Sequence, residues 1–254
     1  MDTVSDAIDA STIIATDSEL LLLPKPTALS TGDIVIPDSE YSAMHGPNNL
    51  LWRAAMDKEK SKMAASSTLF VCPRSEVPAT CKVVGYKWVY TVKNDECKAR
   101  VTLHGFNQIE GVNFFDTSSP TVDSTTHKLF WGVVAEKKMF VLQGDVKAAF
   151  LQAEFTVAVS LFMKMPVAWA AAESPDTVLC VAKPIYGAKQ ASLEFHRAFT
   201  RHMETLSFQQ SINDPCLFTL FTPDSWVMLI IHVDDFLLAA TNEALACKIG
   251  KQIE

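Results

Sequence analysis

The sequence has no apolar stretch long enough to span a membrane, and its N-terminus lacks the basic region and long apolar region of a signal peptide. None of its six cysteines forms a Cys-x-x-Cys pair or lies at metal-site spacing from a histidine. No internal repeat is present. These absences argue against a membrane-spanning protein, a secreted protein and a zinc module, and they predict reduced thiols in an intracellular protein.

Basic residues are nearly absent from the first 46 positions, where Lys25 is the single base among eight acids. This segment accounts for the whole net charge of −7, because bases and acids balance in the rest of the chain. Its acidic composition, rich in Ser and Thr, predicts a disordered leader over residues 1–46 and a folded part over residues 47–254. Residues 53–100 hold ten bases and five acids, which indicates either affinity for polyanions or a solvated basic face.

Two adjacent acids, Asp234 and Asp235, lie between apolar runs at residues 226–233 and 236–240. Each run has the length and composition of a strand that is buried on both faces. We predict a tight hairpin with both acids in its turn, because Asp tolerates the dihedral angles of a two-residue loop. An isolated Asp-Asp pair is usually a solvated turn. At the tip of a buried sheet, however, two like charges are unfavourable unless a cation binds them, which predicts a divalent metal site.

A third acid, Asp145, ends another apolar strand at residues 140–145. Taken alone, it is typical of a turn acid or a helix cap. Beside the Asp234–Asp235 hairpin it completes the set of carboxylates that two metal ions need for in-line phosphoryl transfer. We therefore expect an antiparallel sheet in which the strands ending at Asp145 and Val233 are neighbours. The helices after Asp123 and Ala188 should back this sheet.

The N-terminal half of the folded part predicts a helix followed by a hairpin. The helix begins near Asn49, its possible cap, and its inward positions are Trp52, Ala55, Met56, Glu59 and Met63. The hairpin turns at Asn94 and Asp95 between strands at residues 83–93 and 98–103, and its basic residues suit a phosphate-bearing ligand.

The C-terminal half alternates between helical and extended patterns. A helix capped by Asp123 or Ser124 is predicted to turn four residues inward: Leu129, Phe130, Val133 and Val134. The other predicted elements are strands at residues 157–163, 178–181 and 216–221, a helix over residues 188–206 and a last helix capped by Thr241.

The chain also carries a series of short blocks in a fixed order. They are WRAAM at 52–56, KWVY at 87–90, KARV at 98–101, GFNQ at 105–108, SPTV at 119–122, QGDVKAAFL at 143–151, IYGAKQA at 185–191 and HVDD at 232–235. In this order and spacing, the blocks resemble the reverse transcriptase domain of copia-type long-terminal-repeat retrotransposon polyproteins, over about residues 49–254.

The resemblance implies an α+β fold, a right-hand polymerase with an antiparallel palm sheet backed by helices and a fingers subdomain. The fingers would comprise about residues 47–122 and 155–185, and the palm about residues 123–154 and 186–254. It also implies RNA-directed DNA synthesis from deoxynucleoside triphosphates on an RNA or DNA template-primer. Two Mg²⁺ ions, or Mn²⁺, would serve as cofactors, with no membrane partner. The implied location is cytoplasmic, in a virus-like particle, or nuclear.

Carried over residue by residue, the resemblance makes Asp145 and Asp234 the principal metal ligands, and Asp235 completes the catalytic triad. Phe150 falls where related enzymes place an aromatic steric gate against a ribose 2′-hydroxyl, and a core phenylalanine is the alternative. His232 replaces the usual Tyr, as a buried histidine facing the template-primer or as a satisfied core histidine. The implied nucleotide-binding residues are Lys98, Arg100, Phe150, Tyr186, Gly187 and Lys189.

Some positions depart from the family pattern. The linker between Lys93 and Lys98 is several residues shorter, which would trim the hairpin that closes on the nucleotide. Ala188, Ser192-Leu193 and Phe195 replace the expected Leu, Pro-Arg and Trp. We expect a fragment without thumb and ribonuclease H regions. Three functions stay open: an RNA-directed DNA polymerase domain, an inactive remnant that binds nucleic acid or a partner, and another two-metal phosphoryl-transfer enzyme such as a nuclease.

Overall fold

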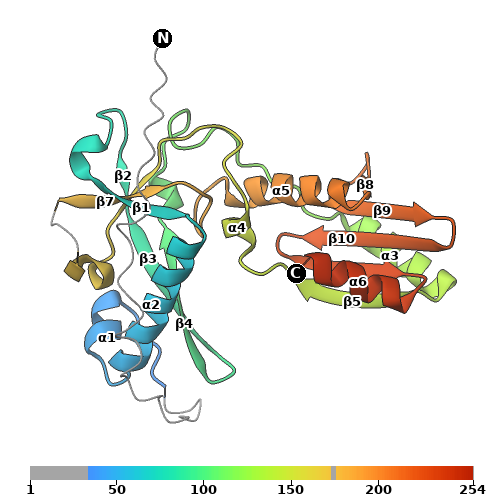
Figure 1. The fold of residues 1–254 in the computed structure, drawn as a ribbon, viewed down its shortest axis with the longest axis horizontal. Helices are drawn as coiled ribbons and strands as arrows, with labels where there is room; N and C mark the ends of the chain where they lie inside the picture. The colour runs from blue at the N-terminus through green and yellow to red at the C-terminus, as the bar shows by residue number, and fades with distance from the viewer. Residues whose placement is uncertain (1–33, 173–175, 254) are drawn as a thin grey trace.

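The computed structural model describes residues 34–172 and 176–253, which form two lobes (Figure 1). The first lobe has one large apolar cluster, and the second lobe has two that lie on opposite faces of a sheet. The chain crosses between the lobes more than once, so neither lobe is a continuous piece of sequence. The short helix α4 (Ala149–Gln152) lies between them. This mixture of helices and sheets agrees with the predicted α+β class.

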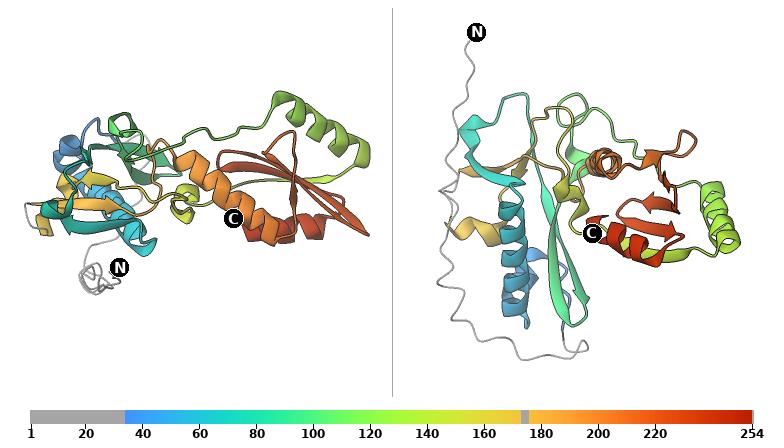
Figure 2. Two further views of the ribbon diagram at one scale, coloured as in Figure 1. Left: turned by 90° about the horizontal axis from the view of Figure 1, so that it is seen from above. Right: turned by 45° about the vertical axis from the view of Figure 1, so that its right-hand side comes forward.

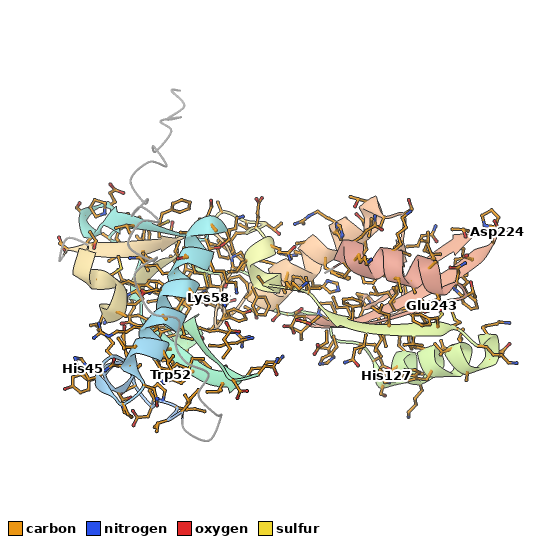
Figure 3. The ribbon with its side chains drawn as sticks, turned by 60° about the horizontal axis from the view of Figure 1, so that its bottom comes forward. His45, Trp52, Lys58, His127, Asp224 and Glu243 are labelled. Carbon is orange, nitrogen blue, oxygen red and sulfur yellow. The ribbon has the colours of Figure 1, made fainter. Side chains whose placement is uncertain are left out.

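The second lobe is built on a five-stranded antiparallel sheet in the order β5–β11–β10–β9–β8. Its strands are β5 (Phe140–Asp145), β8 (Gln209–Gln210), β9 (Leu217–Thr222), β10 (Ser225–His232) and β11 (Asp235–Ala240). The β9–β10 turn lies at the far end of this lobe, where Asp224 is labelled in Figure 3. The predicted strand at residues 140–145 and the strands around the acid pair are confirmed.

The predicted order of these strands is wrong in one respect. β5 pairs with β11, the strand that follows the acids, and not with β10, the strand that leads to them. The reason is topological: one edge of β10 pairs with β11 and the other with β9. The outer edge of β11 is therefore the one that β5 can pair with.

Helices cover both faces of this sheet (Figure 2), which explains why its central strands are continuously apolar. On one face, α3 (Ser124–Lys137) packs against β10 and β11. On the other face lie α5 (Ala191–Thr205) and α6 (Glu243–Ile253). The strand residues buried beneath α5 and α6 alternate along the sequence: Val227, Leu229, Ile231, Phe236, Leu238 and Ala240. The helices predicted after Asp123 and Ala188 are confirmed, and they lie on opposite faces.

The first lobe contains a four-stranded sheet in the order β1–β7–β6–β2 and a separate two-stranded hairpin, β3–β4. The strands are β1 (Leu69–Pro73), β2 (Val83–Val84), β3 (Tyr86–Lys93), β4 (Glu96–Leu103), β6 (Phe162–Lys164) and β7 (Thr177–Val181). The helices are α1 (Glu40–His45) and α2 (Asn49–Ala65), with 3₁₀ turns η4 (Arg74–Glu76), η5 (Gly105–Asn107) and η6 (Val167–Ala172). The strand predicted at residues 157–163 shortens to β6, and the carbonyl of Ser160 accepts a side-chain hydrogen bond from Asn113 (2.6 Å).

The helix and hairpin predicted near the start of the fold are confirmed. All five predicted inward residues of α2 are buried. The predicted cap is wrong by one position, because Asn48 is the N-cap and its side chain accepts a hydrogen bond from Val35 N (2.9 Å). Asn94 and Asp95 form the β3–β4 turn with φ angles of 54° and 60°. Both angles fit the left-handed turn type that closes two-residue hairpins.

The boundary predicted for the acidic leader needs correction. Residues 34–46 belong to the first lobe, because Glu40 of α1 accepts hydrogen bonds from the Tyr86 hydroxyl and from Ala168 N, both at 2.7 Å. The indole of Trp52 also donates to the carbonyl of Val35 (3.0 Å). These specific contacts fix the segment despite its acidic composition. The rest of the predicted leader, residues 1–33, lies outside the described residues.

Three smaller predictions concern helix faces and caps. Asp123 caps α3 by accepting from Thr125 N (2.7 Å), as predicted. Leu129 is wrong as an inward residue, because 59% of it is exposed. The last helix is capped by Asn242, which accepts from Leu245 N (3.0 Å), whereas Thr241 accepts from Trp226 N. Across the described part of the chain, every helix is too short or too polar to cross a membrane.

Candidate active site

The acid pair lies at the turn between β10 and β11, one residue out of the predicted register. His232 pairs with Asp235, so the two-residue loop is Val233–Asp234 and Asp235 is the first residue of β11. Val233 has a φ of 59°. Positive φ is unfavourable for a β-branched residue and is found where the surrounding structure imposes it, often at functional sites.

Three polar residues form a row across the sheet at this turn. Asp235 is the direct partner of His232 on one side and of Asp145 on the other. Directly opposed residues of antiparallel strands project from the same face, with Cβ atoms about 4.5–5.5 Å apart. All three are exposed. The prediction that His232 is buried is therefore wrong, and its place in the row puts an imidazole beside the acids.

Two further features hold the end of β5 against the acid turn. Val146 N donates a hydrogen bond to the carbonyl of Asp234 (2.9 Å), beyond the regular ladder. Gly144 lies under the ring of Phe236, and a Cβ at this position would lie 2.5 Å from the ring atom Cζ. A side chain at residue 144 would push β5 away from β11. The glycine that precedes Asp145 is therefore needed for the pairing that brings the acids together.

The acids offer the ligands that a hard divalent cation prefers, because they are carboxylates, with Asp145 and Asp235 exposed and Asp234 half-buried. Within the described ranges, however, no three His, Cys, Asp or Glu side chains lie close enough together to hold a metal ion. The backbone brings Asp145, Asp234 and Asp235 into adjacent positions, while their side chains do not converge in this conformation. Ion binding at this site would require the three carboxylates to rotate toward one another.

A second cluster forms around the ring of Tyr186, in the segment before α5. The guanidinium carbon of Arg100 lies 5.4 Å from the ring centroid, and Nζ of Lys62 lies 5.9 Å from it. Phe150 contacts the same ring edge to face, with centroids 5.2 Å apart. Burial raises the pKa of Tyr186, Arg100 lowers it, and the charges of Glu59 and Asp234 raise it further. Phe150 follows Asp145 by only five residues, so the chain itself keeps this cluster near the acids.

Gly187 fixes the position of Tyr186 against β4. Leu103 N donates to the carbonyl of Tyr186 (2.8 Å), which brings the two backbones together. Gly187 has a φ of 83°, and a Cβ there would overlap the carbonyl oxygen of Leu103 and lie 2.6 Å from Cγ2 of Thr102. A Cβ added at Gly105 would overlap the carbonyl oxygen of Gly187 in the same way. Gly187 therefore allows the close crossing that brings Tyr186 beside Arg100.

Lys98 and Lys189, both predicted to bind the nucleotide, lie outside the Tyr186 cluster. Lys98 is on the exposed hairpin, where Nζ is 3.9 Å from the carboxylate of Glu96. The ammonium group of Lys189 lies 4.5 Å from the ring centroid of Phe114. Its backbone N–H donates to Gln108 Oε1 (2.8 Å), which joins it to a buried amide network. Arg100, Phe150, Tyr186 and Gly187 are the predicted residues that the structure brings together.

Sequence reasoning missed two members of the cluster, Lys62 and Glu59 of α2. Glu59 was placed on the inward face of the helix without a role. An acid on an apolar stripe was the available signal, because a buried carboxylate is unfavourable without compensating partners. Lys62 gave no signal, since a lysine one turn from an acid on a helix is common.

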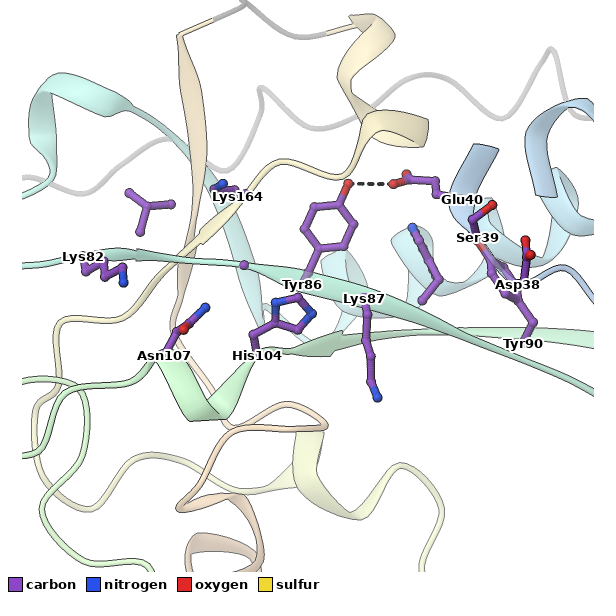
Figure 4. Close-up of a pocket in the computed structure, with 13 residues that line it drawn as sticks. Asp38, Ser39, Glu40, Lys82, Tyr86, Lys87, Tyr90, His104, Asn107 and Lys164 are labelled. Atoms are coloured by element: carbon purple, nitrogen blue, oxygen red, sulfur yellow. Dashed lines mark hydrogen bonds between the residues drawn. The ribbon is translucent and has the colours of Figure 1, made fainter. Parts of the chain in front are cut away.

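A hollow lies on the first lobe beside β3 (Figure 4), with a volume of about 640 Å³. Its acids already have partners: Glu40 binds Tyr86, and Asp38 accepts from Ser42. The pocket is also lined by three lysines: Lys82, Lys87 and Lys164. None of the three has a salt-bridge partner in the described part of the chain. Three lysines against the two carboxylates give the pocket net positive charge.

Comparison with known proteins gives a consistent result. A family model described as "Reverse transcriptase (RNA-dependent DNA polymerase)" matches residues 73–254. The chain is 31% identical over 200 residues, 76% of its length, to "Retrovirus-related Pol polyprotein from transposon RE2" of Arabidopsis thaliana. It is 28% identical over 222 residues, 84% of its length, to the Pol polyprotein from transposon TNT 1-94 of Nicotiana tabacum. The matched segments make up 14% and 16% of these two relatives, so the chain spans a small part of them.

Proposed function

Because the chain belongs to the reverse transcriptase (RNA-dependent DNA polymerase) family, as its sequence blocks predicted, we propose that it carries the polymerase site of a copia-type Pol polyprotein. In this proposal it adds deoxynucleotides to a primer 3′ end on an RNA or DNA template. The observation that supports it best is the pairing of Asp145 with Asp235 next to Asp234, near the cations on Tyr186.

The presence of two lobes supports a division into the two subdomains that this function needs. We assign the five-stranded sheet and α3, α5 and α6 to the palm, and the first lobe to the fingers. The predicted boundaries are kept, at about residues 47–122 and 155–185 for the fingers and 123–154 and 186–254 for the palm, with residues 34–46 added to the fingers. This assignment puts the acids on the palm and Arg100 on the fingers.

Asp145, Asp234 and Asp235 are the residues that would hold two Mg²⁺ ions, or Mn²⁺. The fit rests on their chemistry: they are carboxylates from two paired strands, and no salt bridge in the described part of the chain occupies them. When bound, such ions stabilise charge on the attacking and leaving oxygens of a phosphoryl transfer. In that transfer the primer 3′-hydroxyl gives its proton to solvent and its oxygen bonds to the α-phosphorus, while the bond between the α-phosphorus and the bridging oxygen breaks and pyrophosphate leaves.

The Tyr186 cluster is the site that we propose for the incoming nucleotide. Arg100 offers a guanidinium group for phosphate oxygens, a role suited to its planar set of donors. Phe150 contacts both Tyr186 and Phe195, with centroids 5.2 and 6.3 Å apart, and it is half-buried at the junction of the lobes. This position suits a steric gate and also suits a packing residue. Lys98, two residues before Arg100 on the same face of β4, is a second cation for the phosphates, although its ammonium group lies beside Glu96 in this structure.

The basic pocket beside β3 is the proposed contact for the template strand. Its three lysines can neutralise phosphates, and such contacts give affinity without sequence preference. Tyr86 and Tyr90 also line the pocket and supply aromatic surface for unpaired bases.

A second candidate is a non-catalytic module that binds nucleic acid. Two observations favour it: the acids do not converge on a common ion in the described residues, and the β3–β4 turn has only two residues, Asn94 and Asp95. A two-residue turn adds no loop that could extend the hairpin toward the nucleotide. In this candidate function the basic pocket still binds nucleic acid, but the acids catalyse no nucleotide addition.

Primer extension distinguishes the two candidates. The chain, in excess over a labelled DNA primer on an RNA template, would be supplied with deoxynucleotides and Mg²⁺, and template-primer binding would be measured in parallel. Mg²⁺-dependent extension supports the polymerase. Binding without extension supports the non-catalytic module, and absence of both contradicts each of them. Extension in the presence of a chelator would contradict the assigned cofactors.

A further inference from the structure

We infer that α2 contributes two residues to the nucleotide site: Lys62 binds the triphosphate beside Arg100, and Glu59 positions both cations. This inference rests on the proposed function, since it concerns the same site.

Glu59 is an unusual residue in its surroundings. It is 5% exposed and lies on the apolar stripe of α2 between Met56 and Met63. Its Oε1 has no hydrogen-bond partner. Such a carboxylate is unfavourable unless nearby charges compensate for its lost hydration. A role in stability alone does not account for it, because an apolar residue would fill the same position better.

The compensating charges are the two cations of the Tyr186 cluster. Oε2 of Glu59 lies 3.9 Å from Nζ of Lys62. Burial raises the pKa of Glu59, whereas Lys62, the backbone N–H of Val101 and Arg100 lower it. The carboxylate therefore interacts with one cation from α2 and one from β4. Both are directed to the same ring, at 5.9 and 5.4 Å from its centroid. Glu59 thus connects the two segments that deliver positive charge to Tyr186.

The charges at this point do not balance. One buried carboxylate faces two permanent cations, and Lys62 keeps 38% of its side chain exposed. Among the described residues, Tyr186 is the one ring that two cations contact. Asp234 also acts on Tyr186, but the proposed function assigns its carboxylate to the metal ions, which leaves the excess of Lys62 and Arg100 over Glu59 for a polyanion such as a nucleoside triphosphate. Lys62 supplies a mobile point charge and Arg100 supplies a planar fork of donors.

An ordinary helical salt bridge is the competing explanation. Lys62 and Glu59 are three residues apart on α2, and such pairs stabilise a helix slightly without binding anything. The two explanations differ in what they predict for phosphate affinity, so the test must measure affinity and stability separately.

The experiment measures binding of a deoxynucleoside triphosphate and of its unphosphorylated nucleoside to the chain in Mg²⁺, for wild type and variants. Lys62→Gln should weaken triphosphate binding by roughly tenfold, a typical effect of losing one charged contact, and leave nucleoside binding unchanged. Lys62→Arg should restore most of the affinity. Lys60→Gln is the matched control, because it removes the same charge from the same helix, and it should bind like wild type.

Glu59→Gln tests positioning. It keeps the shape of the side chain and removes the buried charge, so the melting temperature should hold or rise while triphosphate affinity falls several-fold. A structural salt bridge predicts the reverse: lower stability with unchanged affinity. If Arg100→Gln weakens binding but Lys62→Gln does not, the inference fails and the proposed function stands. If the wild-type chain binds no triphosphate, both fail.

Discussion

Replacing Gly187 by alanine tests how the nucleotide cluster is assembled. The added Cβ would overlap the carbonyl oxygen of Leu103, and residue 187 would have to keep a φ of 83°. The hydrogen bond from Leu103 N to Tyr186 O holds the two segments together at this point. We expect Gly187→Ala to separate Tyr186 from β4, and with it from Arg100.

The size of the effect follows from three contributions. A left-handed backbone costs a non-glycine residue about 1–2 kcal/mol. Forcing a carbon atom into packed structure costs about 1–3 kcal/mol, and losing the Leu103–Tyr186 hydrogen bond costs about 0.5–1.5 kcal/mol. Together they predict a loss of roughly 3–6 kcal/mol, a large share of the 5–15 kcal/mol typical of a folded protein.

Two other glycines separate these contributions. Gly111 has a φ of 77° with nothing within 4 Å of an added Cβ, so Gly111→Ala should lose only the backbone contribution, about 1–2 kcal/mol. A Cβ added at Gly105 would overlap the Gly187 carbonyl oxygen, but Gly105 does not have a positive φ. Gly105→Ala therefore isolates the destabilisation that comes from the steric overlap. Urea unfolding followed by circular dichroism measures all three. A loss at Gly187→Ala no larger than at Gly111→Ala would refute the proposed crossing.

Two further predictions concern the junction of the lobes and the base of α3. Phe150→Ala should admit ribonucleotides in primer extension while deoxynucleotide incorporation continues; an unchanged ratio of the two rates, with lower stability, would identify Phe150 as a packing residue. Burial raises the pKa of Asp214, but hydrogen bonds from Thr126 and from the backbone of Asp123 and Cys216 outweigh this and hold the pKa below its usual value. Its contribution to stability is therefore present above the unfolded pKa of about 3.9 and is lost as pH falls through the lower folded value. In denaturant unfolding, Asp214→Asn should be less stable than wild type at pH 7, and this deficit should shrink as the pH falls below the unfolded pKa; a deficit that does not change with pH would contradict the assignment.

Local patterns predicted those parts of the structure that local chemistry decides. The apolar run ending at Asp145 became a strand with the predicted bounds, and the turn at Asn94–Asp95 formed because both residues tolerate positive φ. The inward face of α2 was correct at all five positions, since helical spacing fixes which residues share a face.

Features that depend on distant segments were not predictable in the same way. The order of β5, β11 and β10 depends on which strand edges remain free after the hairpins form. The acid turn moved by one residue because His232 pairs with Asp235, leaving Val233 in the loop despite its unfavourable φ. The helix α1 forms from an acidic segment because Tyr86 and Ala168, far along the chain, both donate to Glu40.

The residues of the candidate site also differ in whether local sequence or distant segments determine their position. The acid pair was proposed from sequence because apolar strands flank it on both sides, and Asp145 because it ends a third. Lys62 could not be assigned a role from sequence. Its position in the site depends on Tyr186, more than a hundred residues away, and on the glycine that lets the two segments approach.

The most direct test of the account is the rate of single-turnover primer extension in Mg²⁺ after removing one charge at a time. Asp145→Asn and Asp234→Asn should each slow extension by roughly a hundred- to a thousand-fold, the effect of losing about 3–4 kcal/mol of transition-state stabilisation, and Asp235→Asn should slow it less. Asp224→Asn removes the same charge from the turn at the far end of the same sheet (Figure 3), and it should extend like wild type. Wild-type extension by Asp234→Asn, or an equal loss in Asp224→Asn, would contradict the assignment of catalysis to these acids.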